Sequence, residues 1–429
     1  MNQLLILSSV DFLFDNAQMD VIIRASTKGG VPMKRIFALI MTLLMSVSFF
    51  GCGEAEESPE TATNPVYTVT GEIPETEELR KMAVKAMRDL LSIQWTPSEQ
   101  LDYYNTAGRD KQFAYVPGTI YGGVLYSGAS TGLLQFMEFY DTETGVLTYP
   151  GTPDELRKNI GTGCADSLLW SWATVSNSFN CGYFPSQMVY KNGFLPVGSY
   201  TYDQNIASFY YLPTQNIIKN NGQKVMLDSY AQMLPADALI SSTVDHAIMV
   251  IEKPTVVRNG DGTVAMDASY VYIQDQRGGT SKGFLEEIVD GKTVQFNSAR
   301  RLKMTFRELY EKNYIPVTVA EFTGEKAYEH ASVTLTTGAC STLEQAKAAV
   351  IEANYPIAVL RLVVTDNAGT ETVLDRVLIH SSTPEGPARS YNTANWAALQ
   401  AVTPGSYQKL RIEVLVSTGQ VLTPIDITP

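Results

Sequence analysis

The sequence predicts a mixed α+β fold built from two successive folded regions. Apolar residues recur at helical spacing over residues 77–93 and 164–175, and three segments between residues 233 and 276 are predicted as strands. From residue 316 onward, about 110 residues of short apolar strands separated by polar turns predict a second, all-β region of the β-sandwich type. The length of 429 residues allows two or three domains.

Residues 33–52 have the pattern of a secretion signal. The basic pair Lys34-Arg35 precedes an apolar stretch of about 16 residues, which is shorter than the roughly 20 residues of a membrane-spanning helix. The stretch ends at Gly51-Cys52, and a cysteine directly after a small residue resembles the lipidation site of bacterial lipoproteins. The resemblance implies that a lipid on Cys52 anchors the protein at the extracellular face of the bacterial cell membrane. Ordinary secretion with cleavage nearby is the alternative.

Two further segments are expected to lie outside the folded regions. Because a signal peptide begins at the N-terminus, we expect Met33 to be the true start and residues 1–32 to be a non-native upstream extension. Residues 53–78 are acidic and rich in Pro, Thr and Ser, so they predict a flexible tether behind the lipid anchor. The folded regions are therefore expected at 79–315 and 316–429.

Charge and cysteine content restrict the possible partners and sites. The formal net charge of −13 leaves no basic surplus with which to bind nucleic acid or an anionic membrane surface, so no nucleic-acid partner is expected. With Cys52 lipidated, the odd set of Cys164, Cys181 and Cys340 leaves at least one thiol free or paired outside the chain. His330 and His380 have no neighbours at metal-ligand spacing.

Cys164 is the candidate nucleophile. It follows Gly161-Thr162-Gly163 and opens a segment with helical periodicity, which puts the thiol where a loop enters a buried helix. Unpaired N–H groups and the positive end of the helix dipole favour the reactive thiolate there. A buried structural cysteine is the alternative interpretation. Trp170 and Trp172 of the same segment are expected in the core.

His246 is the candidate base. It lies near the start of residues 245–252, the second of the three predicted strands, and an Asn-Gly-Asp-Gly turn signal separates this strand from the third, 270–276. We expect these two strands to pair antiparallel with Glu252 opposite Tyr270.

The same register selects a partner for the imidazole. It places His246 opposite Gln276, and because side chains alternate along a strand, Gln274 and Gln276 share the face of the histidine while Asp275 lies on the other. We therefore expect Gln276 to orient the imidazole, with Gln274 and Asp275 as alternatives.

These motifs, in this order, resemble the NlpC-type cell-wall cysteine peptidases, a compact branch of the papain-like fold. The segment Gly163-Cys164-Ala165-Asp166-Ser167 stands where that family has Asp-Cys-Ser-Gly before an apolar helix. Residues 234–239 look like its Leu-x-Pro-Gly-Asp-Leu strand, and residues 246–250 look like its His-Val-Gly-Ile-Tyr. The glycine before Cys164 and the aspartate two positions after it depart from the family pattern. The resemblance covers roughly residues 80–315.

The resemblance implies a hydrolase that needs no metal or cofactor. Cys164 attacks a carbonyl carbon, His246 moves the proton, and Gln276 orients the imidazole. The backbone N–H of Cys164 helps to hold the oxyanion. An upstream tyrosine helps to hold substrate in the family, and Tyr121 or Tyr126 is expected in that role.

The expected function is cleavage of amide bonds in peptidoglycan stem peptides. Two alternatives stay open: a non-catalytic surface binding protein on a degenerate peptidase fold, and an amidase or thioesterase acting on small or lipid substrates. The region 316–429 is expected to bind a wall polymer, a substrate or another surface protein, or to act as a structural spacer.

Overall fold

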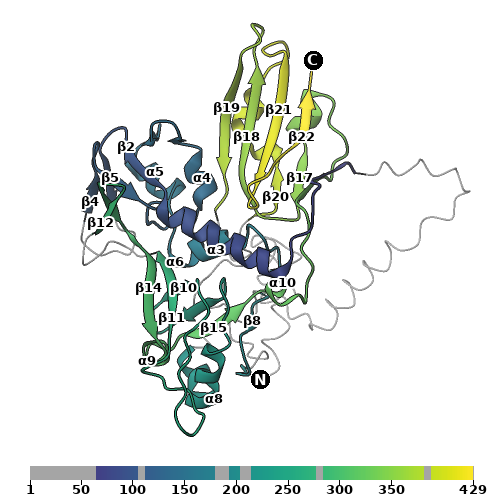
Figure 1. The fold of residues 1–429 in the computed structure, drawn as a ribbon. Helices are drawn as coiled ribbons and strands as arrows, with labels where there is room; N and C mark the ends of the chain where they lie inside the picture. The colour runs from purple at the N-terminus through teal and green to yellow at the C-terminus, as the bar shows by residue number, and fades with distance from the viewer. Residues whose placement is uncertain are drawn as a thin grey trace, which may run out of the picture. The chain divides into compact units, whose positions relative to one another are not determined.

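The computed structural model describes residues 64–104, 112–178, 193–202, 214–276, 284–380 and 388–428 (Figure 1). Within these residues the fold is mixed α+β with several antiparallel sheets, which agrees with the predicted class at that level. The expected upstream extension, the signal peptide and Cys52 lie outside the described residues, as does Cys181. No helix in the described part of the chain is both long enough and apolar enough to cross a membrane.

The candidate base lies on an antiparallel sheet of six strands in the order β14-β11-β10-β9-β15-β8. These strands are β8 (Leu195–Pro196), β9 (Ala238–Ser241), β10 (His246–Val250), β11 (Tyr270–Gln276), β14 (Ser298–Thr305) and β15 (Ile315–Thr318). The helices that contact the sheet include α3 (Thr76–Ser92) and α6 (Cys164–Trp172). Helix α3 buries Leu79, Ala83 and Leu90, whose spacing puts them on one face of the helix.

A second sheet of six strands, in the order β12-β13-β5-β2-β7-β6, mixes parallel and antiparallel neighbours. Its strands are β2 (Gln94–Pro97), β5 (Ile120–Gly122), β6 (Tyr140–Asp141), β7 (Val146–Leu147), β12 (Leu285–Val289) and β13 (Lys292–Phe296). The pairs β13–β5 and β2–β7 are parallel. A separate two-stranded sheet joins β3 (Leu101–Tyr104) to β4 (Gln112–Tyr115).

Two antiparallel sheets of four strands form the C-terminal part, in the orders β1-β16-β17-β20 and β19-β18-β21-β22. The first contains β1 (Val66–Thr68), β16 (Ser332–Leu335), β17 (Val350–Ala353) and β20 (Ser390–Asn392). The second contains β18 (Ile357–Thr365), β19 (Glu371–Leu378), β21 (Lys409–Val416) and β22 (Val421–Ile427), which run side by side in Figure 1. Strand β22 also contacts β1 and β16, so the two sheets share a buried apolar layer.

Further helices, most of them short, connect these strands. They are α4 (Leu133–Met137), α5 (Pro153–Asn159), α8 (Thr214–Tyr230), α9 (Phe306–Glu311), α10 (Ala320–Thr323), α11 (Leu343–Lys347), α12 (Ala397–Ala401) and the 3-10 helix η2 (Thr393–Asn395). Threonines at positions 152, 305 and 342 cap α5, α9 and α11 by accepting a backbone N–H from three residues further on.

The structure differs from the predicted segment boundaries at three places, the first of which is the start of α3 at Thr76, inside the expected tether. Strand β1 lies inside the expected tether, where Val66 pairs with Thr334 of β16. Strand β15 crosses the expected boundary at residue 316, and its Val317 pairs with Ala238 of β9. Both strands are stabilised by partners distant in the sequence, which the local pattern of apolar residues does not reveal.

Candidate active site

Cys164 is the first residue of α6, as the sequence predicts. Gly163 before it has an extended backbone, with φ −90° and ψ −179°. The N–H of Ser167 donates to Gly163 O at 3.0 Å, and Ser167 Oγ donates to Cys164 O at 2.8 Å. These two bonds form the first turn of α6, so the helix begins at the cysteine itself. The N–H groups of a first turn have no intrahelical acceptor, so they and the helix dipole favour a negative charge on the thiol.

Residues 125–132, called the site loop below, hold the segment that leads into Cys164. Thr162 N–H donates to Leu125 O at 2.8 Å, and Ser127 N–H donates to Thr162 O at 3.3 Å. Thr131 N–H donates to Gly161 O at 2.9 Å, and Gly161 N–H donates to Thr131 Oγ1 at 2.9 Å. The position of the nucleophile thus depends on a neighbouring loop as well as on its own helix.

Gly161 is a position in this segment where a side chain does not fit. Its φ of +128° is one that L side chains rarely adopt, and a Cβ there would lie 2.2 Å from Ser127 Oγ and 2.9 Å from Leu125 O. We expect Gly161→Ala to lower the free energy of unfolding by about 2–4 kcal/mol, because backbone strain and steric overlap add. Urea denaturation measures the change.

Gly262→Ala is the matched control for this substitution. Gly262 also has a positive φ, +84°, but a Cβ there would meet no atom within 4 Å. Gly262→Ala should therefore lower the free energy of unfolding only by the cost of its strained backbone, about 1–2 kcal/mol. Equal losses in the two variants would contradict a packing role for Gly161.

His246 opens β10 and contacts both Asp275 and Cys164. Its Nε2 lies 2.6 Å from Asp275 Oδ1, and the side chain of Asp275 is 2 % exposed against 22 % for the histidine. The Cys164 side chain is close enough to the imidazole to raise its pKa. Because Asp275 engages Nε2, Nδ1 is the nitrogen that remains for the thiol. A thiol, an imidazole and a carboxylate therefore lie next to one another in that order.

These contacts set the charge of the imidazole. Burial by itself lowers the pKa of His246, but the hydrogen bond to Asp275 and the contact with Cys164 outweigh burial and raise the pKa to about 10. At neutral pH the protonated imidazole is therefore the favoured form. A proton held on His246 is available to the leaving group of an acyl-transfer reaction.

The structure corrects the predicted partner of the imidazole. Gln276 is fully buried and its Nε2 donates to Val124 O at 2.9 Å, away from His246. Gln274 lies opposite Met249 on the neighbouring strand. Asp275, the alternative that the expected register places on the wrong face, makes the bond.

A shift of one residue in the strand pairing explains this error. Val250 pairs with Ile273, where the expected register placed Tyr272. The pairing changes again beyond Pro254, which has no N–H to donate, so that Tyr270 bridges to Thr255 and not to Glu252. A one-residue shift exchanges the two faces of a strand, and it brings Asp275 to the histidine.

Tyr126 lies beside the cysteine–histidine pair. Burial raises the pKa of its hydroxyl well above the ordinary value, and the negative charges of Cys164, Asp166, Asp245 and Asp275 raise it further. Asp166 is in the first turn of α6 and Asp245 directly precedes β10. The sequence analysis did not select these two carboxylates, although each lies next to a predicted catalytic residue.

Tyr121, the other predicted substrate tyrosine, lies in the core instead. It is 3 % exposed, and its ring centroid lies 4.7 Å from that of Tyr115 and 5.3 Å from that of Trp95. Its hydroxyl accepts the N–H of Val116 at 2.9 Å. Tyr121 sits opposite Trp95 in the β2–β5 pair, so the strand aims its ring at an aromatic cluster.

A buried ion pair anchors the segment that leads into β9. Arg80 Nη1 of α3 lies 2.8 Å from Asp237 Oδ1, with side chains 9 % and 2 % exposed. Arg80 also donates to Pro235 O at 2.8 Å, and Asp237 Oδ2 accepts the N–H of Leu234 at 2.7 Å. The sequence analysis chose this motif for its resemblance to a family strand, and it did not find Arg80.

Helix α6 also binds the segment that leads into β9. Trp172 Nε1 donates to Ala236 O at 2.7 Å, and the indole is fully buried. Trp170 is 5 % exposed. The prediction that both tryptophans belong to the core is confirmed.

Within the described residues, no group of three or more His, Cys, Asp and Glu side chains is arranged to hold a metal ion. His330 Nε2 bonds to Gly71 O at 3.0 Å and His380 Nδ1 to Ala129 O at 2.6 Å, so both make backbone contacts. Comparison with protein-family models, curated proteins and solved structures finds no match.

Proposed function

We propose that this protein is a cysteine hydrolase that cleaves amide bonds, with Cys164 as nucleophile, His246 as general acid and base, and Asp275 as the group that orients the imidazole. The observation that carries the proposal is the position of His246, whose Nε2 lies 2.6 Å from Asp275 Oδ1 and whose imidazole is close enough to Cys164 for the thiol to raise its pKa. A nucleophile, a base and an orienting group in this order are the elements of nucleophilic acyl transfer.

The proposed reaction is acyl transfer through a covalent thioester. The thiolate Sγ of Cys164 attacks the carbonyl carbon, and N–H groups at the start of α6 stabilise the oxyanion. The C–N bond breaks as the His246 imidazolium gives its proton to the departing amine, which leaves an acyl thioester. The neutral imidazole then takes a proton from water, the hydroxide displaces the thiolate, and the carboxylic acid product leaves.

The substrate class and location in this proposal come from the sequence. The order of the cysteine, Leu-Pro-Ala-Asp and histidine motifs resembles NlpC-type peptidases on a papain-like fold, which favours peptidoglycan stem peptides. The apolar leader ending at Cys52 favours a lipid-anchored protein on the extracellular face of a bacterial membrane. In this proposal the two C-terminal sheets form a β-sandwich of the accessory kind.

Thiol reactivity tests the proposal without knowledge of the substrate. We expect iodoacetamide to label Cys164 rapidly below pH 7 in protein that starts at Gly53, and we expect His246→Ala to abolish this labelling, because an ordinary thiol titrates near pH 8.5. Mass spectrometry of the Cys164 peptide measures the rate at each pH. Cys340 is the internal control, because burial raises the pKa of its thiol.

The outcome decides between the candidate functions. Labelling only above pH 8, unchanged by His246→Ala, would eliminate the dyad and leave the non-catalytic binding protein. If the dyad is established, a panel of stem peptides, small amides and thioesters then distinguishes a peptidase from an amidase or thioesterase.

A further inference from the structure

We infer that the C-terminal β19-β18-β21-β22 sheet is part of the machinery that positions the nucleophile, and that His380 is a positioning residue for it. This inference rests on the proposed function and assigns a role to the C-terminal part that differs from substrate binding or spacing. It is built on four sets of contacts: three join this sheet to the site loop, to α4 and to α6, and the fourth joins the site loop to the segment before Cys164.

The first contact joins the sheet to the site loop. His380, two residues after β19, has its Nδ1 2.6 Å from Ala129 O. A carbonyl oxygen only accepts, so the imidazole donates here. Beside this bond, Gln135 Nε2 of α4 donates to Ile379 O at 2.9 Å, and Gln135 is fully buried.

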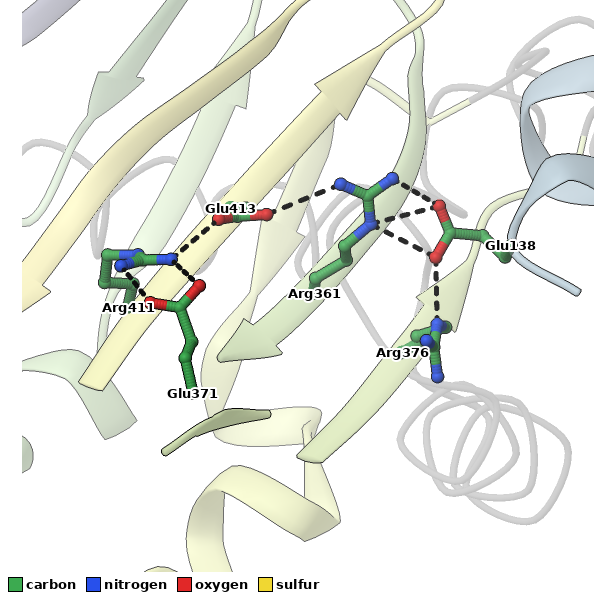
Figure 2. A network of polar contacts seen from close by, with 6 residues as sticks. All are labelled: Glu138, Arg361, Glu371, Arg376, Arg411 and Glu413. Atoms are coloured by element: carbon green, nitrogen blue, oxygen red, sulfur yellow. Dashed lines mark hydrogen bonds and ion pairs between the residues drawn. The ribbon is translucent and has the colours of Figure 1, made fainter. Parts of the chain in front are cut away.

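The second contact is an ion-pair network at the other end of α4. Glu138, whose side chain is only 4 % exposed, accepts from Arg361 Nε of β18 at 3.0 Å and from Arg376 Nε of β19 at 2.9 Å. Figure 2 shows Arg361 continuing to Glu413, and Glu413 to Arg411, across the sheet. A carboxylate this buried is stabilised only while its arginines stay in place, so the network fixes where α4 lies.

The third contact is apolar and lies next to these polar groups. Trp170 of α6 packs in a cluster with three residues of the sheet, Ala358, Val359 and Leu415. The indole Nε1 of Trp170 donates to Ser130 O at 3.1 Å, which ties α6 to the site loop. The sheet thus contacts the helix that carries the nucleophile and the loop that faces it.

The fourth set of contacts links the site loop to the segment that leads into Cys164. The carbonyl that His380 binds belongs to Ala129, whose N–H donates to Ser127 Oγ at 3.0 Å. Ser127 N–H in turn bonds Thr162 O, two residues before the nucleophile. A shift of the loop therefore moves the chain that enters α6, and with it the distance between Sγ and the imidazole.

The network in Figure 2 also borders a cavity of about 330 Å³, and a ligand site is the competing explanation. The lining includes Arg361 and Arg376 but also Glu138, Glu371 and Glu413. Glu138 and Glu413 pair with the two arginines and Glu371 pairs with Arg411, so each charged group of the lining already has a partner of opposite sign. The arrangement favours docking of α4 on the sheet.

The test replaces His380 in the full chain by Leu and by Asn. We expect His380→Leu to slow labelling of Cys164 at pH 6.5 by about 3- to 10-fold, the equivalent of one hydrogen bond, and to speed amide exchange at Ser127, Thr131 and Thr162 by a similar factor. His380→Asn keeps a donor near the Nδ1 position and should stay within about twofold of the wild type. His330→Leu is the matched control, because His330 also bonds a backbone carbonyl, that of Gly71.

The outcomes separate the two proposals. If His380→Leu matches His330→Leu in both labelling and exchange, the positioning role is wrong even when the wild type labels rapidly. If the wild type does not label below pH 7, the proposed function fails, and amide exchange alone still decides the positioning role. Should His380→Leu not fold, Arg376→Met weakens the same docking at Glu138, which keeps its bonds to Arg361.

Discussion

Asp275→Asn is expected to lower the labelling rate of Cys164 at pH 6.5 by about 100-fold. The carboxylate keeps the pKa of His246 raised to about 10, and the imidazolium in turn stabilises the thiolate. Without that charge the imidazole loses its proton more readily, and a neutral imidazole no longer stabilises the thiolate that reacts with iodoacetamide. Hydrolysis of any substrate found should fall by about 100- to 10,000-fold.

The pH dependence of hydrolysis should also differ between the wild type and Asp275→Asn. In the wild type the imidazolium persists until the pH approaches the raised pKa of His246, about 10. The alkaline decline in hydrolysis should therefore begin only near that pH. In Asp275→Asn the decline should begin at lower pH, because the imidazole loses its proton more readily.

Asp245→Asn is the matched control. It removes a carboxylate next to His246 in the chain, and asparagine tolerates the φ of 49° at that position. We expect a change of less than about threefold, since Asp245 does not supply the bond to Nε2 that Asp275 makes. A wild-type labelling profile in Asp275→Asn, or an equal effect of Asp245→Asn, would contradict the role of Asp275.

Arg80→Met is expected to cost about 3–5 kcal/mol of unfolding free energy. It leaves Asp237 buried without its charge partner, which is far more costly than loss of a surface pair. Methionine keeps an apolar contact with Phe322, over whose ring the guanidinium lies at 4.9 Å. The control is Lys85→Met on the same helix, whose exposed pair with Asp89 should be worth no more than about 0.5 kcal/mol.

The direction of the pH dependence identifies Asp237 as the cause. Burial raises the pKa of Asp237, and Arg80 opposes that effect, so removing the arginine raises the pKa further. A carboxyl group with a raised pKa in the folded state binds protons more tightly than in the unfolded state, and stability then falls as pH rises. The loss in Arg80→Met should therefore be smaller at pH 4 than at pH 8. Asp237→Asn added to Arg80→Met should recover part of the loss at pH 8, and no recovery would rule out the uncompensated charge.

The sequence predicts those parts of the site that local patterns determine. Cys164 at a helix start and His246 at a strand start both follow from apolar periodicity and its boundaries. The partner of the histidine depends on pairing between two strands, and the observed pairing differs by one residue from the expected one. A proline shortly after a predicted strand, such as Pro254, indicates that regular pairing is interrupted, but the register itself is visible only once both strands are placed.

Local patterns likewise predict some elements of the fold and not others. The buried face of α3 and the long strands β18 and β21 are evident from local patterns. Strands β1 and β15 are short and depend on partners remote in the sequence, so no local window favours them. Tyr121 and Tyr126 resemble each other in sequence context, and only the β2–β5 pairing assigns Tyr121 to the core.

Strand β1 determines the order in which the chain can complete its fold during synthesis. It leaves the ribosome ahead of every other described element, yet its partner β16 follows only after both six-stranded sheets have been translated. Loop closure over so long a span is slow, and until then β1 has no sheet to join. We therefore expect the first strand made to be among the last to pair. A polypeptide shortened before β16 would leave this strand without a partner, and one that begins after β1 would leave an unpaired edge on the sheet, where strands from other copies can add.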